Sequence, residues 1–246
     1  MKDSMGDRIK DYEDRFRHML PRRAYTMIRL DGKAFHTYTR NLERPFDQDF
    51  RRAMQFAAQY VCSNAQGCKL GYVQSDEISL VLTDFDGIGT SAWFDGNMQK
   101  IVSVAASMAS AAFNLIRFQQ TGTGCTEVFD GRCWSLADPW EVYNSFLWRQ
   151  KDCTRNAVQM VARSVASHKE CHNKNLSQLQ ELIHEKGLNF NDFPVDCKRG
   201  AFLYPSENGW VVDTNSPILS QEQAYFFSKV PLIEQFKYVE TIPVVL

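Results

Sequence analysis

Ile28-Arg29-Leu30-Asp31-Gly32-Lys33-Ala34-Phe35-His36 is the stretch that decides the fold, together with the later Gly71-Tyr72-Val73-Gln74-Ser75-Asp76-Glu77-Ile78-Ser79-Leu80-Val81-Leu82. In each stretch an apolar, strand-like run meets carboxylates at one end. If two such ends met on neighbouring strands, their oxygens would form a site for a hard divalent cation such as Mg²⁺. Paired metals are a recurring device of phosphoryl and nucleotidyl transfer. The two stretches therefore predict an enzyme that handles nucleotides.

The composition indicates a cytoplasmic protein with no membrane partner. With 246 residues, of which 44% are hydrophobic and 23% charged, the chain can bury a substantial core. It has no run of about 18 uncharged apolar residues, which a membrane-spanning helix requires. Its first residues also lack the apolar region of a signal peptide. The seven cysteines form no CxxC pair, so we expect reduced and mostly buried thiols.

The periodicity of apolar residues predicts a mixed, α+β fold. Strands are expected over 24–30, 70–74, 78–83 and 125–129, and helices over 3–19, 48–64 and 97–118. Asp47 is the expected N-cap of the 48–64 helix. From the first strand onward the order is β-α-β-β-α-β, which is typical of a split β-α-β, ferredoxin-like sheet with helices on one face.

The second part of the chain is expected to extend this sheet. Residues 138–186 are predicted to be mainly helical, with Asp138 and Pro139 as N-cap and first helical residue. From residue 200 onward the proline content indicates an irregular tail with short strands. We therefore expect a ferredoxin-like domain over 1–137, with its N-terminal helix, and a helical extension with an irregular tail over 138–246. The two parts are expected to pack as one unit.

The predicted topology brings the acidic residues together. Asp31 follows the first strand, where Gly32 lets the backbone turn tightly and leaves a carbonyl free to face an ion. Asp76 and Glu77 fall at the hairpin between the second and third strands. Taken singly, an Asp-Gly turn or a charged hairpin tip is commonly found without any ligand. In a β-α-β-β-α-β sheet, the end of the first strand lies beside that hairpin, so the acids are expected to meet at one edge.

Four motifs in this arrangement resemble those of the tRNA(His) guanylyltransferase family, whose catalytic domain is similar to the palm of template-reading polymerases and nucleotide cyclases. They are Arg29-Leu30-Asp31-Gly32 with Phe35-His36, Gly71-Tyr72-Val73-Gln74-Ser75-Asp76-Glu77, Phe129-Asp130-Gly131-Arg132, and Trp148-Arg149-Gln150-Lys151-Asp152. The resemblance spans residues 1–205 in the family's order. It implies a polymerase-palm sheet, 3′-to-5′ addition of nucleotides to the 5′ end of tRNA with ATP- or GTP-dependent activation of that end, and a homotetramer.

The resemblance also implies a role for each matching residue. Asp31, Asp76 and Glu77 would be catalytic, and two Mg²⁺ ions would be held by Asp31, the Gly32 carbonyl and Asp76. Contacts to ATP, GTP and other NTPs would come from Arg29, Lys33, Ala34, Phe35, His36, Arg44, Asp47, Ser75, Lys100 and Arg132. Guanidinium and ammonium groups suit triphosphate oxygens. Lys100 also lies on the polar stripe of the predicted 97–118 helix.

An RNA partner must be held by local patches, because the formal net charge of −1 gives no global basic excess. The RNA-binding candidates are Arg149, Lys151, Arg155, Arg163 and Lys169. Residues 155, 159 and 163 have the i, i+4 spacing of one helical face, so they could follow an RNA backbone. Scattered cations of this kind are also common on surfaces that bind nothing.

Two departures from the family pattern bear on the substrate. Residues 154–160 replace the His-x-Asn-Asn-Leu-Tyr-Asn stretch that eukaryotic members use in tRNA(His) selection, and Arg44-Pro45 stands where the family often has Lys-Pro. The chain is similar instead to the bacterial and archaeal branch, which implies template-directed repair of 5′-truncated tRNAs. The alternatives are a dedicated tRNA(His) guanylyltransferase, a palm-type nucleotide cyclase, or a non-catalytic RNA-binding module.

Overall fold

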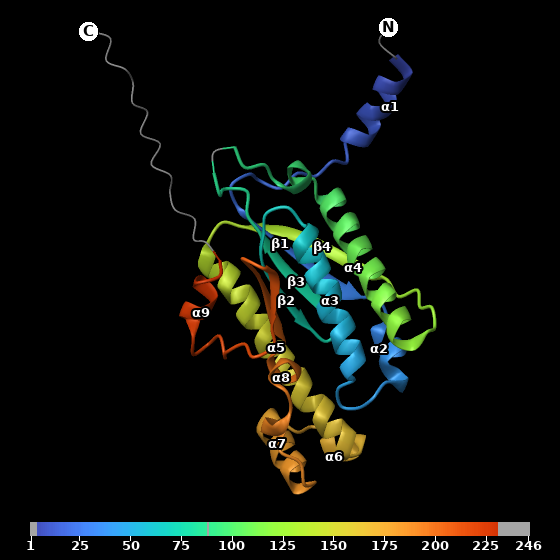
Figure 1. Ribbon diagram of the computed structural model, residues 1–246, viewed down its shortest axis with the longest axis vertical. Coiled ribbons are helices and arrows are strands. Elements are labelled where there is room, and N and C mark those ends of the chain that lie inside the picture. The colour runs from blue at the N-terminus through green and yellow to red at the C-terminus, as the bar shows by residue number, and fades with distance from the viewer. Residues whose placement is uncertain (1–3, 88, 231–246) are drawn as a thin grey trace, which may run out of the picture.

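The protein is built around a six-stranded antiparallel sheet in the order β4-β1-β3-β2-β5-β6. This computed structural model describes residues 4–87 and 89–230 (Figure 1). The strands are β1 (Tyr25–Gly32), β2 (Cys68–Gln74), β3 (Glu77–Leu82), β4 (Phe129–Leu136), β5 (Ala201–Ser206) and β6 (Gly209–Asp213). The order of the first four strands is that of a ferredoxin-like sheet. The predicted fold class is therefore confirmed.

The helices follow the sequence pattern closely in the first half of the chain and less closely in the second. They are α1 (Ser4–Asp14), α2 (Phe35–Tyr38), α3 (Gln48–Asn64), α4 (Met98–Thr121), α5 (Pro139–Val165), α6 (His168–Cys171), α7 (Leu176–Glu185), α8 (Val195–Arg199) and α9 (Gln223–Phe227), with short 3-10 turns at Thr39–Asn41, Trp93–Gly96 and Phe190–Asp192. The side chain of Asp47 accepts a hydrogen bond from the Phe50 N–H, and that of Asp138 from the Trp140 N–H. Both predicted N-caps are confirmed.

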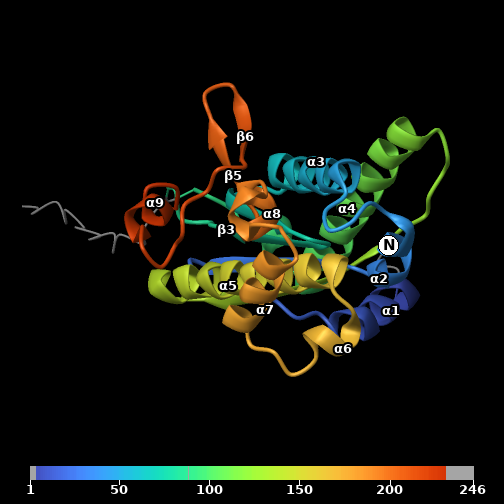
Figure 2. The ribbon, with the colours of Figure 1, turned by 90° about the horizontal axis from the view of Figure 1, so that it is seen from below.

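Helices cover both faces of the sheet, whereas the sequence predicted one covered face. Figure 2 shows α3 and α4 on one side of the strands and α5 on the other. Ile28 and Leu30 of β1 pack into the core under α3 and α4, while Tyr25 and Met27 alternate to the side of α5. Because β3 is buried along its whole length, each face of the sheet needs a covering layer. Helix α5 supplies the second one.

Helix α4 is a core helix of this arrangement. In the described part of the chain it is the one helix that is long and apolar enough to cross a membrane, judged by length and composition. Its residues Ile101, Ala105 and Phe113 are buried against the sheet. The apolar stripe is thus used in packing within the domain.

Strand β4 starts where the predicted strand was expected to end, so the expectation for residues 125–129 was wrong. Asp130-Gly131-Arg132 reads as a turn, yet it lies inside β4 and pairs with β1. The strand is at the edge of the sheet, where polar residues can face solvent. A Cβ atom at Gly131 would lie 3.0 Å from a methyl group of Leu30 and 3.3 Å from the Val102 carbonyl oxygen. The glycine therefore permits the close packing of α4 on this strand.

Three other boundaries differ from the prediction. Helix α1 ends at Asp14, before Pro21, and the 138–186 segment divides into α5, α6 and α7. The tail is more regular than expected, because β5 pairs with β2 and β6 with β5. Two of its prolines, Pro231 and Pro243, lie outside the described residues.

Candidate active site

The carboxylates predicted to converge lie at one edge of the sheet. Asp31, at the end of β1, is directly opposite Glu77 on β3 and Asp130 on β4. The Gly32 N–H donates to the Asp76 carbonyl over 2.9 Å, which ties the end of β1 to the β2–β3 hairpin. That hairpin turns through Ser75, whose φ of 46° lies in the left-handed region. The end of β1 and the hairpin tip therefore lie side by side, and the charge of Asp76 acts on Asp31.

Gly32 is needed for a close approach. A Cβ atom at this position would lie 2.5 Å from the ring of Phe35. Phe35 is buried in the core and packs near Phe50, Phe113 and Phe129. Only glycine lets this ring fill the space beneath the strand end, so the Asp-Gly pair anchors the end of β1 on a packed aromatic cluster.

The electrostatics of this edge favour a bound cation. Burial raises the pKa of Asp31, and the negative charges of Asp76, Glu77 and Asp130 raise it further. Burial also raises the pKa of Asp76, against the lowering effect of hydrogen bonds from its own backbone and from Ser75. In the part of the chain that the structure describes, neither aspartate forms a salt bridge with a lysine or arginine. A divalent cation would relieve this repulsion.

The donor set suits Mg²⁺ shared with a substrate. Among the described residues, no group of three or more His, Cys, Asp or Glu side chains is arranged to enclose a metal. Mg²⁺ does not require such a cage, because it commonly binds one or two carboxylates and completes its shell with waters and substrate phosphates. Asp31, Asp76 and the Gly32 carbonyl fit that pattern.

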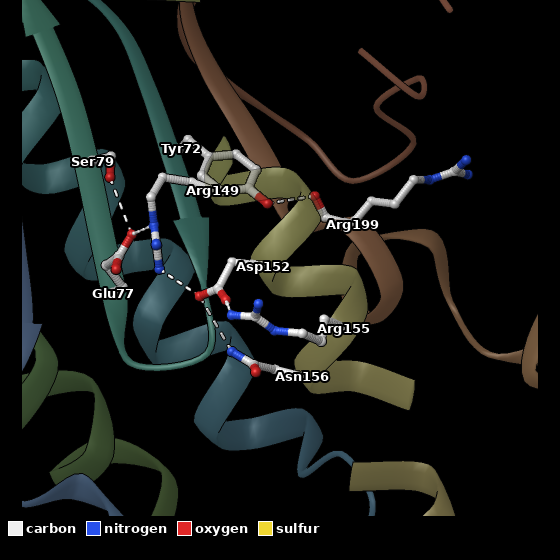
Figure 3. Close-up of polar contacts among 8 residues, drawn as sticks. All are labelled: Tyr72, Glu77, Ser79, Arg149, Asp152, Arg155, Asn156 and Arg199. Atoms are coloured by element: carbon white, nitrogen blue, oxygen red, sulfur yellow. Dashed lines mark hydrogen bonds and ion pairs between the residues drawn. The ribbon is translucent and has the colours of Figure 1, made fainter. Parts of the chain in front are cut away.

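Glu77 is held by an arginine of α5 (Figure 3). The Arg149 Nε lies 2.7 Å from the Glu77 carboxylate, and the other end of the guanidinium lies 2.8 Å from Asp152. Ser79 donates a further hydrogen bond to Glu77 over 3.3 Å. The side chains of Arg149 and Glu77 are only 12% and 11% exposed. Arg149, predicted to contact RNA, is therefore buried between two acids, and its guanidinium is not displayed on the helix surface.

Two further arginines lie opposite each other on β1 and β4. Arg29 and Arg132 are Cα partners in the sheet register, and like charges in this position repel unless an anion lies between them. Arg132 is exposed, with Asp130 at 3.4 Å. Lys100 is not brought to this pair, since it is exposed in the first turn of α4 on the other face of the sheet. Lys33 and Ala34 are exposed in the loop after β1.

A cavity of about 440 Å³ opens beside the hairpin tip. Its walls come from the loop between β1 and α3, from α3, from the hairpin, and from α5 and α8. It brings together six residues that were predicted to bind nucleotide or metal, namely Phe35, His36, Arg44, Asp47, Ser75 and Asp76. Apolar atoms of Phe50, Met54 and Met160 line it as well. A pocket of this size, with an apolar floor and convergent polar groups, suits a nucleotide.

One wall of the cavity was not predicted from the sequence. Asp196 of α8 accepts hydrogen bonds from Arg51 over 2.9 Å and from Gln55 over 2.8 Å. The partners are separated by more than a hundred residues in sequence, so no local pattern connects them. The available signal was the i, i+4 spacing of Arg51 and Gln55 on α3, which places both on one face of the helix.

The remaining RNA-binding candidates are surface cations. Lys151, Arg155 and Arg163 are exposed on α5, and Lys169 is exposed on α6. Arg155 pairs with Asp152, which also binds Arg149. The exposed cations form a stripe along α5 that continues onto α6, and Arg163 within it also lines the cavity beside the hairpin tip.

Comparisons with known proteins agree with this geometry. The family model described as tRNAHis guanylyltransferase matches residues 6–137. The tRNA(His) guanylyltransferase of Schizosaccharomyces pombe is 32% identical, over 85% of this chain and 84% of the relative. A bacterial tRNA(His) guanylyltransferase-like protein solved with ATP superposes with a TM-score of 0.89 and 42% identity, covering 93% of this chain and all of that one. A bacterial tRNA(His) guanylyltransferase-like protein solved with GTP superposes with a TM-score of 0.81 and 40% identity, covering 94% of this chain and all of that one.

Proposed function

This chain belongs to the tRNA(His) guanylyltransferase family, a family of nucleotidyltransferases, and we propose that it repairs 5′-truncated tRNAs by template-directed 3′-to-5′ addition. The observation that carries the proposal is the convergence of Asp31 and Asp76 beside a cavity of about 440 Å³. The solved bacterial relatives contain ATP or GTP. We propose that the cavity of this chain takes the same nucleotides.

The reaction reverses the usual direction of polymer growth. The 3′-hydroxyl of the incoming nucleotide attacks the activated 5′ phosphate of the RNA, a new P–O bond forms, and the bond to AMP or pyrophosphate breaks. A tRNA with a 5′-monophosphate must first be adenylylated by ATP. Two triphosphate-binding places are therefore needed. We assign one to the cavity with His36, Arg44 and Ser75, and the other to the arginine pair Arg29 and Arg132.

The carboxylates prepare the site for this chemistry. Asp31, Asp76 and the Gly32 carbonyl would hold two Mg²⁺ ions, with Glu77 kept in place by Arg149. When bound, Mg²⁺ lowers the pKa of the attacking hydroxyl and neutralises the leaving group. Arg29 and Arg132 orient phosphate oxygens, because a planar guanidinium binds two of them at once. The apolar wall formed by Phe50, Met54 and Met160 excludes water from the base and ribose.

We favour tRNA repair over dedicated tRNA(His) modification because of the sequence and packing of α5. Residues 154–160 lack the polar stretch that eukaryotic members carry there, and much of this segment is used for packing. Thr154 donates to the Lys198 carbonyl over 2.9 Å, while Ala157 and Val158 are buried. Arg155 and Asn156 are exposed, but both bind Asp152, so few side chains of this segment are free to read one particular tRNA. Base pairing in the acceptor stem can supply the missing specificity, as guide pairing does in other nucleic-acid enzymes.

A substrate competition tests this proposal. The purified protein is incubated with Mg²⁺, ATP, all four NTPs, and two tRNAs: a full-length tRNA(His) without its extra 5′ guanosine, and a non-His tRNA without its first nucleotide. We expect the truncated tRNA to be the better substrate and to receive the nucleotide that pairs with the opposite strand. The Asp76→Asn variant is the inactive control.

The other outcomes separate the alternatives. Preference for tRNA(His), or addition of G whatever the opposing base, would support a dedicated guanylyltransferase. No addition to either tRNA, with cyclic nucleotide detected by chromatography, would support the cyclase. No turnover of any kind would support a non-catalytic RNA-binding module.

We further propose that the whole chain acts as one unit and assembles as a homotetramer in the cytoplasm. Pairing of β5 with β2, together with the packing of α5 on the sheet, supports joint action of residues 1–137 and the described residues beyond them. Sedimentation analysis of the full chain would test the oligomeric state.

A further inference from the structure

Trp148 is an exposed indole at the edge of the candidate active site. It is a residue of α5, and Phe146 and Gln150, two positions before and after it, are both buried. The helix is therefore firmly packed at this point. The residue itself is 55% exposed. A single exposed aromatic ring is unremarkable on a protein surface. The surroundings of this ring are what make it informative.

Two guanidinium groups fix the position of the ring. The guanidinium carbon of Arg149 lies 4.3 Å from the ring centroid, and that of Arg29 lies 5.6 Å from it. Arg149 is itself tied to Glu77 and Asp152. Arg29 also lies 5.9 Å from the ring of Trp134. The indole is therefore held by cation–π contacts to Arg149, which two acids anchor, and to Arg29, which also contacts Trp134. Little further conformational entropy is lost when a ligand contacts the ring.

The ring also lies close to the carboxylates. Arg29 and Asp31 are on the same face of β1, two residues apart, which corresponds to about 7 Å along a strand. Arg149, the neighbour of Trp148, binds Glu77, and Glu77 is opposite Asp31. Trp148 is not among the residues that line the 440 Å³ cavity. A free nucleotide in the cavity therefore leaves the ring uncovered.

We propose that Trp148 is the platform on which the 5′-terminal nucleobase of the acceptor RNA stacks. This inference rests on the proposed function. An open, rigid aromatic ring beside cations suits a base and its phosphate, because aromatic stacking and arginine contacts together bind the ends of nucleic acids. The occupant is the RNA, because its 5′ end must lie beside the triphosphate assigned to Arg29 and Arg132. Weaker ATP binding by Trp148→Ala with unchanged RNA binding would instead assign the ring to the base of the activating nucleotide. Stacking would hold the 5′ phosphate next to Asp31 and Asp76.

Trp140 provides a matched control. It lies on the same helix, two turns before Trp148, and is 51% exposed. Its ring packs against Phe227, with centroids 4.6 Å apart, and against Tyr143. It is therefore equally large and accessible, but it is partnered by apolar rings and lies away from the carboxylates.

The experiment measures RNA binding without turnover, using the full chain and fluorescently labelled truncated tRNA. We expect Trp148→Ala to weaken binding roughly five- to 150-fold, the range for one stacked base. Trp148→Phe should retain most of the affinity, and Trp140→Ala should match the wild type. In a separate turnover assay, the KM for the NTP bound in the cavity should not change in any of them. Equal affinities for Trp148→Ala and Trp140→Ala, or a loss confined to the NTP, would overturn the proposal.

A change in the RNA provides a second test that does not depend on any variant folding. A tRNA with an abasic 5′-terminal nucleotide should bind more weakly to the wild type, yet lose no further affinity with Trp148→Ala. Equal losses in both proteins would contradict stacking on Trp148. Because binding is measured directly, a chain that adds no nucleotide would refute the proposed function while still deciding the role of Trp148.

Discussion

Arg149 and Glu77 form a buried ion pair, with 2.7 Å between the guanidinium Nε and the carboxylate. The pair joins α5 to the start of β3, next to Asp76 in the hairpin turn and opposite Asp31 on β1. The second end of Arg149 binds Asp152, which in turn binds Arg155 and Asn156 (Figure 3). The orientation of Glu77 is thus set by a residue that lies 72 positions later in the sequence.

Removing the guanidinium should strongly destabilise the fold. In Arg149→Ala, the carboxylate of Glu77 stays buried without a partner, and we expect a loss of about 3–5 kcal/mol in the free energy of unfolding. Arg155→Ala is the control, because Arg155 pairs with the same Asp152 but is 56% exposed, and its loss should cost at most about 1 kcal/mol. Chemical denaturation measures both. Equal losses for the two variants would mean that burial of the Arg149–Glu77 pair does not increase its contribution to the free energy of unfolding.

Asp31→Asn and Asp76→Asn should abolish nucleotide addition and leave the fold intact. Each substitution preserves the shape of the side chain and removes one ligand charge. The activation free energy should therefore rise by several kcal/mol, which lowers the rate on the order of a thousandfold or more. Asp86→Asn is the control. Asp86 pairs with Lys69 away from the hairpin tip, and its substitution should leave the rate unchanged. Near-wild-type activity of Asp31→Asn in Mg²⁺ would refute the metal assignment.

The stabilising effect of Mg²⁺ should depend on pH. Burial raises the pKa of both Asp31 and Asp76, so the stability that these groups contribute is present below the ordinary aspartate pKa and is lost as pH rises through the raised values. Mg²⁺ binds the ionised form. The increase in Tm that Mg²⁺ gives should therefore be small near about pH 4 and reach its full size at neutral pH.

A charge-removing variant checks the sign of this effect. Without Mg²⁺ at neutral pH, Asp31→Asn should melt at a higher temperature than the wild type, because one buried negative charge is gone. Its Tm should respond little to Mg²⁺, whereas Asp86→Asn should behave as the wild type. A wild-type Mg²⁺ response that does not vary with pH would contradict the role given to these carboxylates.

Local patterns were sufficient to predict the centre of the fold. Alternating apolar residues and the turn at Ser75-Asp76 predicted the β2–β3 hairpin, and capping residues predicted the starts of α3 and α5. The convergence of Asp31 with Asp76 followed from topology, since a ferredoxin-like order places the end of β1 beside that hairpin. These features depend on residues close together in sequence, or on the strand order that a β-α-β-β-α-β connection produces.

Contacts between distant segments could not be predicted in this way. Nothing near Arg149 indicates that it binds Glu77, and its position among Lys151 and Arg155 made it resemble a surface cation. In the same way, Asp196 reaches Arg51 only because α8 packs on α3 and α5. Strand β4 was misplaced because Asp-Gly usually marks a turn, while its edge position and the close packing of α4 on Gly131 allow a strand there.

The exposed cations of α5 should contribute to tRNA affinity through phosphate contacts. Lys151 and Arg163 are exposed, and among the described residues neither forms a salt bridge, so they can displace counterions from an RNA backbone. Arg163 also lines the cavity, so NTP binding by the variant is measured beside tRNA binding. The double variant Lys151→Gln/Arg163→Gln should weaken binding to all tRNAs alike and reduce the slope of log K against log salt by roughly one per lost contact. Lys10→Gln/Arg52→Gln removes the same charge from α1 and α3, and we expect no change in its slope. If both double variants lowered the slope equally, net charge rather than this stripe would account for binding. An unchanged slope in both would mean that Lys151 and Arg163 do not contact the RNA.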